Sequence, residues 1–217
     1  MRILPWLFSV SFLLAGPVVA ADGDGANSGF LGDSYSRLED ARSPSGHKVR
    51  RWISPALGAR SYEAMLLERT VLWPQPADSA QISVATLNEI AACLDETLAR
   101  ELGAVLTLSP VAGARTLRFR PAITAVAGKD MGFKAYQLLP IAFIATLGRT
   151  TKKATLSVEY QILDAESGEV LAAGMREDAG EDIGSVGDRL TLDSVRPAIE
   201  RWARDARAFV EAARSGK

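Results

Sequence analysis

A strict alternation of apolar and polar residues from Ala154 to Ile162 is the feature that most limits how this chain can fold. Successive side chains of a strand point to opposite faces of a sheet, so the pattern predicts a strand with one apolar face. Turn-forming residues follow at Asp164–Gly168, and an apolar run returns from Val170 to Met175. This order predicts a β-hairpin whose apolar face must be covered by another element.

Two segments with helical periodicity can provide that cover. Apolar residues recur at three- and four-residue steps from Leu87 to Leu102, with Asp78 and Ser79 as start signals and Gly103 as a stop signal. A second apolar stripe runs from Val195 to Val210. We predict a long helix at each place, and both helices on the same face of the sheet.

Two further segments favour strands. The apolar run from Tyr62 to Trp73 ends at prolines, which is typical of a buried strand. Residues Leu117–Ala125 alternate, although Pro121 within them indicates an edge strand or a bulge. The predicted fold is therefore α+β: a single domain over residues 56–217, with a mainly antiparallel sheet and two long helices packed on one face.

The first 20 residues have the pattern of a secretory signal peptide. Arg2 precedes an apolar run from Ile3 to Ala15, and small residues follow at Val18–Ala21. The run is shorter than the roughly 20 apolar residues that a spanning helix needs. We expect residues 1–20 to be cleaved after Ala20 or Ala21, and a soluble mature protein in the periplasm. No cysteine lies near that site to accept a lipid.

Residues 21–55 are predicted to be a flexible leader followed by an irregular arm. Residues 21–29 are mostly Gly, Asp, Asn and Ser, which do not form a regular element. Large apolar residues such as Phe30, Tyr35 and Trp52 are then scattered among turn formers. We expect a few of them to pin the arm to the domain.

Composition excludes several classes of function. The chain has 25 basic and 26 acidic residues, and a formal charge of −1 argues against a polybasic nucleic-acid binder. A single cysteine excludes an internal disulfide and a multi-cysteine zinc site, and a single histidine excludes any mechanism that needs two. We expect no cofactor and no metal.

Gly32-Asp33-Ser34 resembles the nucleophile motif of the Gly-Asp-Ser esterases, but the necessary partner is missing. In such a mechanism a histidine takes the proton of the serine. The only histidine here is His47, in a polar stretch, and the last third of the chain has none. We therefore expect no catalytic residue, and a Ser34–His47 ester hydrolase is the third and least favoured hypothesis.

Other reactive or charged residues have simpler interpretations. Cys93 is expected to be a small buried hydrophobe rather than a reactive thiol. His47, beside Lys48, Arg50 and Arg51, is expected to lie in a solvated basic loop rather than an anion or pH-sensing site. The carboxylates of two acidic groups are expected to form a solvated acidic edge rather than a calcium site, since no twelve-residue calcium loop is present. They are Asp164, Glu166 and Glu169, and then Glu177, Asp178, Glu181 and Asp182.

The apolar segment Leu138–Leu147 shows neither strand nor helix periodicity. It could be a buried strand, or an exposed patch formed by Leu139, Ile141, Phe143 and Ile144 that contacts a partner protein, a ligand or the membrane surface. A pocket beside it, lined by Phe133, Tyr136 and Phe143, would favour binding of a small ligand or lipid.

Short motifs in the amino-terminal arm are similar to those of a known bacterial family. Ser28-Gly29-Phe30-Leu31, Tyr35-Ser36-Arg37-Leu38, Arg51-Trp52 and the Asp164…Gly168-Glu169 turn resemble the domain of unknown function 3313. The resemblance implies an exported envelope protein, in many members a lipoprotein, and it implies no catalytic residue. The absence of a lipidation cysteine departs from that pattern.

Three hypotheses for the function follow from these patterns. The first is a non-catalytic envelope protein that works through contacts with another envelope protein. The second is a module that binds a small ligand or lipid. The third is the ester hydrolase.

Overall fold

The computed structural model describes residues 27–79, 82–129, 153–182 and 189–214. The predicted hairpin forms the middle of a single sheet, in which β7 (Lys153–Asp164) pairs with β8 (Val170–Asp182) and with β6 (Thr116–Lys129), antiparallel on both sides. The strand order is β1-β2-β8-β7-β6-β3-β5, and β4 also pairs with β6. The remaining strands are β1 (Glu39–Arg42), β2 (Lys48–Ile53), β3 (Ala64–Leu67), β4 (Val71–Leu72) and β5 (Thr107–Leu108).

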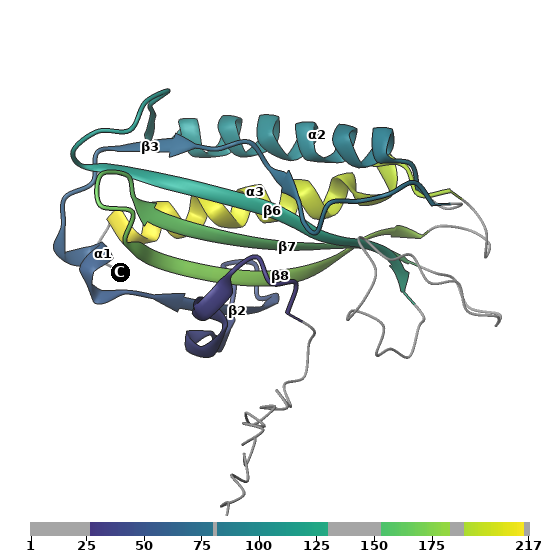
Figure 1. Ribbon diagram of the computed structural model, residues 1–217, viewed down its shortest axis with the longest axis horizontal. Helices are drawn as coiled ribbons and strands as arrows, with labels where there is room; N and C mark the ends of the chain where they lie inside the picture. The colour runs from purple at the N-terminus through teal and green to yellow at the C-terminus, as the bar shows by residue number, and fades with distance from the viewer. Residues whose placement is uncertain (1–26, 80–81, 130–152, 183–188, 215–217) are drawn as a thin grey trace, which may run out of the picture.

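The two predicted long helices, α2 (Val84–Gly103) and α3 (Leu192–Arg214), lie side by side along one face of the sheet (Figure 1). Their apolar stripes and the apolar residues of β7 form one buried core, in which Leu94, Ile199 and Leu156 are almost fully inaccessible to solvent. The α+β fold with a mostly antiparallel sheet is therefore confirmed. The sheet is mixed, because β3 pairs in parallel with β5 and β6.

The start of α2 is five residues later than Ser79. Ser83 is the N-cap, and its hydroxyl accepts a hydrogen bond from the backbone of Thr86 at 3.1 Å. The carboxylate of Asp78 nevertheless accepts one from the backbone of Val84 at 2.7 Å, so the predicted start signal acts from outside the helix.

The turn between β7 and β8 is held by one carboxylate. Asp164 accepts hydrogen bonds from the backbone of Ser167 at 2.8 Å and of Glu166 at 3.0 Å, and from the hydroxyl of Tyr62 at 2.8 Å. These donors stabilise the ionised form, so the pKa of Asp164 lies well below its usual range. Asp164 is thus a turn residue and not part of a solvated acidic cluster.

Two strand predictions need correction. The run from Tyr62 to Trp73 is not one strand, because β3 and β4 are separate and Thr70 between them is bonded to Asp95 of α2. Pro121 is not on an edge: β6 lies inside the sheet, and Pro121 falls between the stretches of β6 that pair with β3 and with β4. The irregularity in its pairing with β7 comes slightly later, between Ile123 and Ala125.

The prediction of an irregular arm is wrong for residues 39–53. β1 and β2 form a hairpin there, and β2 pairs with β8 through Arg50–Ile53, which extends the sheet beyond the helices. A short helix, α1 (Pro55–Ala59), follows the N-cap Ser54. Period-two alternation is weak in this hairpin because both of its faces carry polar residues, so the sequence pattern did not indicate it.

The opposite face of the sheet is covered by the start of the described chain. A 3-10 helix, η1 (Gly32–Arg37), lies across that face beside β2 (Figure 1). Leu31 and Leu38 pack there on Ala173 in a second, smaller core. Glu159 and Gln161, polar residues of β7 on this face, are therefore buried as well.

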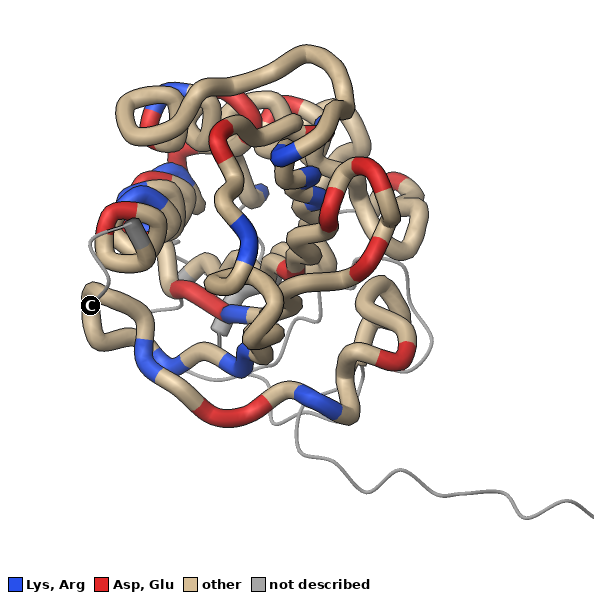
Figure 2. Tube along the Cα trace, turned by 90° about the vertical axis from the view of Figure 1, so that its left-hand side faces the viewer, with Lys and Arg blue, Asp and Glu red and all other residues tan. Residues whose placement is uncertain are grey.

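Basic and acidic residues are interspersed along the trace (Figure 2), in keeping with the near-zero net charge. No helix among the described residues is long and apolar enough to cross a bilayer. The segment Leu138–Leu147, with Leu139, Ile141, Phe143 and Ile144, lies outside the described residues.

Candidate functional site

A pocket of about 70 Å³ lies between the sheet and the second half of α3. It exists because β2 continues the sheet past the edge of α3. The residues of β2 that point to the helical side, Val49, Arg51 and Ile53, line the pocket instead of packing under a helix. Ser43 and Pro44, in the turn between β1 and β2, bound the pocket where that turn reaches α3.

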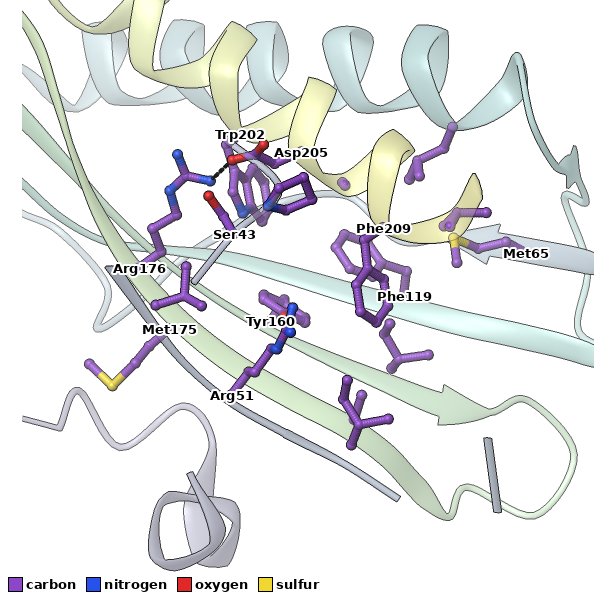
Figure 3. Close-up of a pocket in the computed structure, with 18 residues that line it drawn as sticks. Ser43, Arg51, Met65, Phe119, Tyr160, Met175, Arg176, Trp202, Asp205 and Phe209 are labelled. Atoms are coloured by element: carbon purple, nitrogen blue, oxygen red, sulfur yellow. Dashed lines mark hydrogen bonds and ion pairs between the residues drawn. The ribbon is translucent and has the colours of Figure 1, made fainter. Parts of the chain in front are cut away.

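Aromatic rings form the inner wall of the pocket (Figure 3). The ring of Phe119 stacks on that of Tyr160 with 5.7 Å between centroids, and each lies 6.3 Å from the ring of Trp202. Three rings from β6, β7 and α3 thus meet at one point, an arrangement that adds specific packing to their apolar area. Phe209, about two helical turns after Trp202 on α3, also lines the pocket.

A glycine makes room for the central ring. Tyr160 on β7 is the register partner of Gly174 on β8. A β-carbon built on Gly174 would lie 2.6 Å from the phenolic oxygen of Tyr160, closer than side chains tolerate. The absence of a side chain at position 174 is therefore what lets the phenol lie across β8 toward β2.

Two polar groups face the pocket without a partner among the residues that the structure describes. The guanidinium of Arg51 lies over the ring of Phe209 at 5.4 Å, and no ion pair or hydrogen bond to it is found among the described residues. The hydroxyl of Tyr160 likewise makes no hydrogen bond within the described part of the chain. Burial raises the pKa of Tyr160, although the positive charges of Arg51 and Arg176 act in the opposite direction.

A buried charge network closes one end of the pocket. Arg176 on β8 forms ion pairs with Asp205 on α3 and with Asp178, whose carboxylate lies 2.6 Å away without the alignment of a hydrogen bond. Asp205 also accepts hydrogen bonds from the backbone of Ser45 at 2.9 Å and from its hydroxyl at 2.6 Å. Burial opposes ionisation of Asp205, but these donors together hold its pKa below the usual range. The network fastens the β1–β2 turn to α3.

His47 belongs to this network and not to a serine nucleophile. Its Nδ1 lies 2.8 Å from the hydroxyl of Ser45, whose one proton is donated to Asp205, so Nδ1 must be the donor in that contact. Its Nε2 lies 4.0 Å from Asp178. Ser34, the other residue of the hydrolase hypothesis, is buried in η1, and no hydrogen bond between it and His47 is found among the described residues.

The remaining candidate residues fall in several places. Cys93 is half-buried on α2, packs against the core and accepts a contact from Arg196 at 3.6 Å. Lys48, Arg50 and Arg51 are strand residues of β2 and not a basic loop. Asp178 is only 4% exposed, so the expected solvated edge is wrong for it. Within the described residues no three His, Cys, Asp or Glu side chains are placed to hold a metal ion.

The family-like motifs of the arm serve to cover the second face of the sheet. Glu159 on β7 is 2% exposed and accepts a hydrogen bond from the hydroxyl of Tyr35 at 2.6 Å. The same hydroxyl accepts from the backbone of Gly29 at 3.0 Å, and Gln161 donates to the carbonyl of Leu31 at 3.4 Å. The motif residues Ser28–Leu31 and Tyr35 are thus the partners of buried polar groups on β7.

Sequence reasoning missed the pocket. Its candidate patch (Leu139, Ile141, Phe143 and Ile144) and the expected pocket residues Phe133 and Tyr136 lie outside the described residues, so the idea of a contact patch there stays a prediction. The one signal for the observed pocket was Gly174 inside an otherwise apolar strand, since an isolated strand glycine indicates close approach of another group.

Comparison with known proteins places the chain in a family of unknown function. Residues 26–206 match the model of the family described as protein of unknown function, DUF3313, so the chain belongs to that family. It is 26% identical over 187 residues to the uncharacterized lipoprotein YdcL of Escherichia coli K12, with 84% of each protein covered. The resemblance inferred from the arm motifs is thereby confirmed.

Similarity to solved structures is more distant. The PelC dodecamer of Paraburkholderia phytofirmans is 13% identical, covers 73% of this chain and 96% of its own, and gives a TM-score of 0.38. Protein XCC0632 of Xanthomonas campestris is 12% identical, covers 72% and 88%, and gives 0.42. Likeness at this level bears on neither ligand nor assembly.

Proposed function

We propose that this protein is exported to the cell envelope and binds a small ligand there in the pocket between β2, β8 and α3. The observation that carries the proposal is the pocket itself: three aromatic rings in contact, beside two polar groups for which the described residues supply no partner. Ligand sites in proteins combine an apolar wall with a few polar groups in this way. The proposal favours the second of the three hypotheses drawn from the sequence.

Export is supported by two independent observations. The first 20 residues follow the signal-peptide pattern, and the relative YdcL is described as a lipoprotein. The only cysteine of this chain is Cys93, within α2, so we propose export with a cleaved leader and no lipid anchor. Fractionation of the exporting cells should place the protein in the periplasm with Ala21 or Asp22 at its amino terminus. Retention of residues 1–20 would contradict the proposal.

Binding without catalysis is proposed because the polar groups at the pocket do not form a nucleophile with its base. The hydroxyl of Ser45, nearest to His47, already donates its proton to a carboxylate. The purified protein should therefore show no turnover of ester, peptide or glycan substrates. Turnover that one point mutation abolishes would contradict this part of the proposal.

Occupancy of the pocket can be tested by filling it. Ala206 lines the pocket from α3, whereas Ala212 is exposed on the same helix. We expect Ala206→Phe to abolish binding of hexanol, measured by calorimetry, while Ala212→Phe leaves it unchanged. Retained thermal unfolding would show that both variants fold. Equal binding by both variants, or no binding of any small amphipathic probe by the unmodified protein, would contradict the proposed function.

A further inference from the structure

We infer that the ligand of this pocket is a small amphipathic anion, whose charged head is bound by Arg51 and Tyr160 and whose apolar body lies between the aromatic wall and α3. The inference rests on the proposed function, because it names the class of ligand for that same pocket. A fatty-acid-like carboxylate and an apolar phosphate ester share this chemistry.

The charge of Arg51 provides the first argument. Two other arginines that lie on the sheet have acidic partners: Arg176 with two carboxylates, and Arg118 with Glu68. Among the described residues the guanidinium of Arg51 contacts the ring of Phe209 and makes no ion pair, and its cross-strand neighbour Glu39 is exposed. A half-buried guanidinium carries planar donors that match a carboxylate or phosphate. Its missing partner is therefore an anion.

The phenol of Tyr160 provides a second donor beside the first. Figure 3 shows Arg51 reaching from β2 toward the Tyr160 ring, in agreement with the influence of its charge on that phenol. Because burial raises the pKa of Tyr160, the hydroxyl keeps its proton at neutral pH and can donate it. A hydroxyl donor and a guanidinium together bind an anion in preference to a neutral head group.

The nearby carboxylate does not favour a cation. Asp205 lines the pocket, but its oxygens already accept from Ser45 and from Arg176. The positive charge of Arg51 is thus the uncompensated charge at the pocket among the described residues. An ammonium head group would be repelled by it.

The size of the pocket limits the apolar body. A volume of 70 Å³ corresponds to about five to seven water-sized groups, at roughly 10–15 Å³ each. A methylene group is close to a water molecule in size, so a short chain or a single ring fits. The tail of a longer lipid would have to leave through the open side near Ile53, which is partly exposed.

The test compares three probes of equal length: hexanoate, hexanol and hexylammonium. Calorimetry should give binding in the order hexanoate, hexanol, hexylammonium. Arg51→Met, which keeps an apolar stem over Phe209, should weaken hexanoate binding by roughly ten- to a hundred-fold and leave hexanol unchanged. Tyr160→Phe should also weaken hexanoate binding without changing hexanol binding, but by a smaller factor than Arg51→Met. Arg37→Met is the matched control, since Arg37 stacks on Trp52 at 4.8 Å on the other face of the sheet.

The unmodified protein provides a check that does not depend on folding of a variant. Raising the ionic strength from about 0.01 M to about 1 M shortens the Debye length from roughly 30 to 3 Å, so it should weaken hexanoate but not hexanol. Equal binding of the three probes, or an Arg51→Met variant that still prefers hexanoate, would contradict the inference that the ligand is an anion. Either result would leave the proposed function intact. Absence of binding by every probe would overturn both. Hexyl phosphate, tested in parallel, distinguishes the two head groups.

Discussion

The ring of Tyr160 lies across Gly174, its register partner on the neighbouring strand, with no room for a β-carbon between them. This contact sets the floor of the pocket. It lets a residue of the central strand β7 reach toward β2, where Arg51 is the register partner of Gly174, and the charges of Arg51 and Arg176 both act on the phenol. A substitution at position 174 should therefore act on the pocket through Tyr160.

Gly174→Ala should destabilise the fold by about 1–3 kcal/mol, because the new methyl group would lie 2.6 Å from the phenolic oxygen and the ring must move. Urea denaturation measures the loss. In a Tyr160→Ala background the same change should cost much less, which a double-mutant cycle would detect as coupling. Gly58→Ala is the control, since a β-carbon there meets nothing within 4 Å. Equal effects at positions 174 and 58 would contradict the contact.

The arm should contribute to stability through Leu31. This side chain is 2% exposed and packs on Ala173 beneath the second face of the sheet. Leu31→Ala should lower the free energy of unfolding by about 2–4 kcal/mol. Val111→Ala, at a residue that is 66% exposed, should change it by less than about 0.5 kcal/mol. An arm that is not packed on the sheet would make the two variants alike.

Burial of Glu159 should make stability fall as the pH rises. Desolvation raises the pKa of its carboxyl in the folded protein, although the hydrogen bond from Tyr35 acts in the opposite direction. The folded state then holds a proton that the unfolded state has lost, so stability decreases from the ordinary glutamate pKa upward until the folded-state pKa is passed. Glu159→Gln should remove this decrease, which begins at the ordinary glutamate pKa of about 4 and ends at the raised folded-state pKa.

Chemical denaturation across this pH range measures the effect of Glu159. Glutamine retains an oxygen that can accept from Tyr35, so loss of the hydrogen bond does not obscure the result. Glu177→Gln, at an exposed position of β8, should keep the pH dependence of the unmodified protein. An unchanged slope in Glu159→Gln would show that this carboxyl does not titrate differently on folding.

Breaking the charge network of Arg176 and Asp205 at the end of the pocket should lower the free energy of unfolding. Asp205→Asn removes one of the two charges that pair with the buried Arg176 and weakens the hydrogen bonds from Ser45, and a loss of about 1.5–3 kcal/mol is expected. Because the pKa of Asp205 is depressed in the folded state, its contribution is present above the ordinary aspartate pKa and is lost as the pH falls through the folded-state value. Thermal unfolding should therefore differ between protein and variant at neutral pH and converge in acid.

Glu200→Gln provides the comparison for Asp205→Asn. Glu200 lies on the same helix in an exposed pair with Arg204 at 3.7 Å, and such pairs contribute at most about 1 kcal/mol. A loss in Asp205→Asn no larger than that in Glu200→Gln would mean that the β1–β2 turn is not held by this network.

Much of the fold could be predicted because its central elements have strong periodicity. The alternation from Ala154 to Ile162 and the leucines of α2 each bury one face, so pattern and structure agree. The β1–β2 hairpin was missed because its residues face a pocket on one side and the arm on the other, and neither face is a simple apolar stripe. The alternation of β7 gave no indication that Glu159 and Gln161 on its polar side are buried under the arm.

The pocket could not be predicted because it depends on contacts between distant parts of the chain. Arg51 appeared to belong to a basic stretch, and only the pairing of β2 with β8 brings it beside Tyr160. Likewise, Asp205 lies 160 residues from Ser45, which donates to it. Local sequence patterns do not predict such long-range pairs. The glycine at position 174 was the one local trace of the arrangement.

The most direct test of the account is a chemical-shift titration of the indole resonances with hexanoate. Trp202 forms part of the pocket wall, whereas Trp52 packs on the other face of the sheet and Trp73 is 43% exposed. Saturable shifts of the Trp202 indole alone, with a smaller response to hexanol at the same concentration, are the predicted result. Shifts confined to Trp52 or Trp73, or no saturable shift of Trp202, would contradict the existence of a ligand site in this pocket.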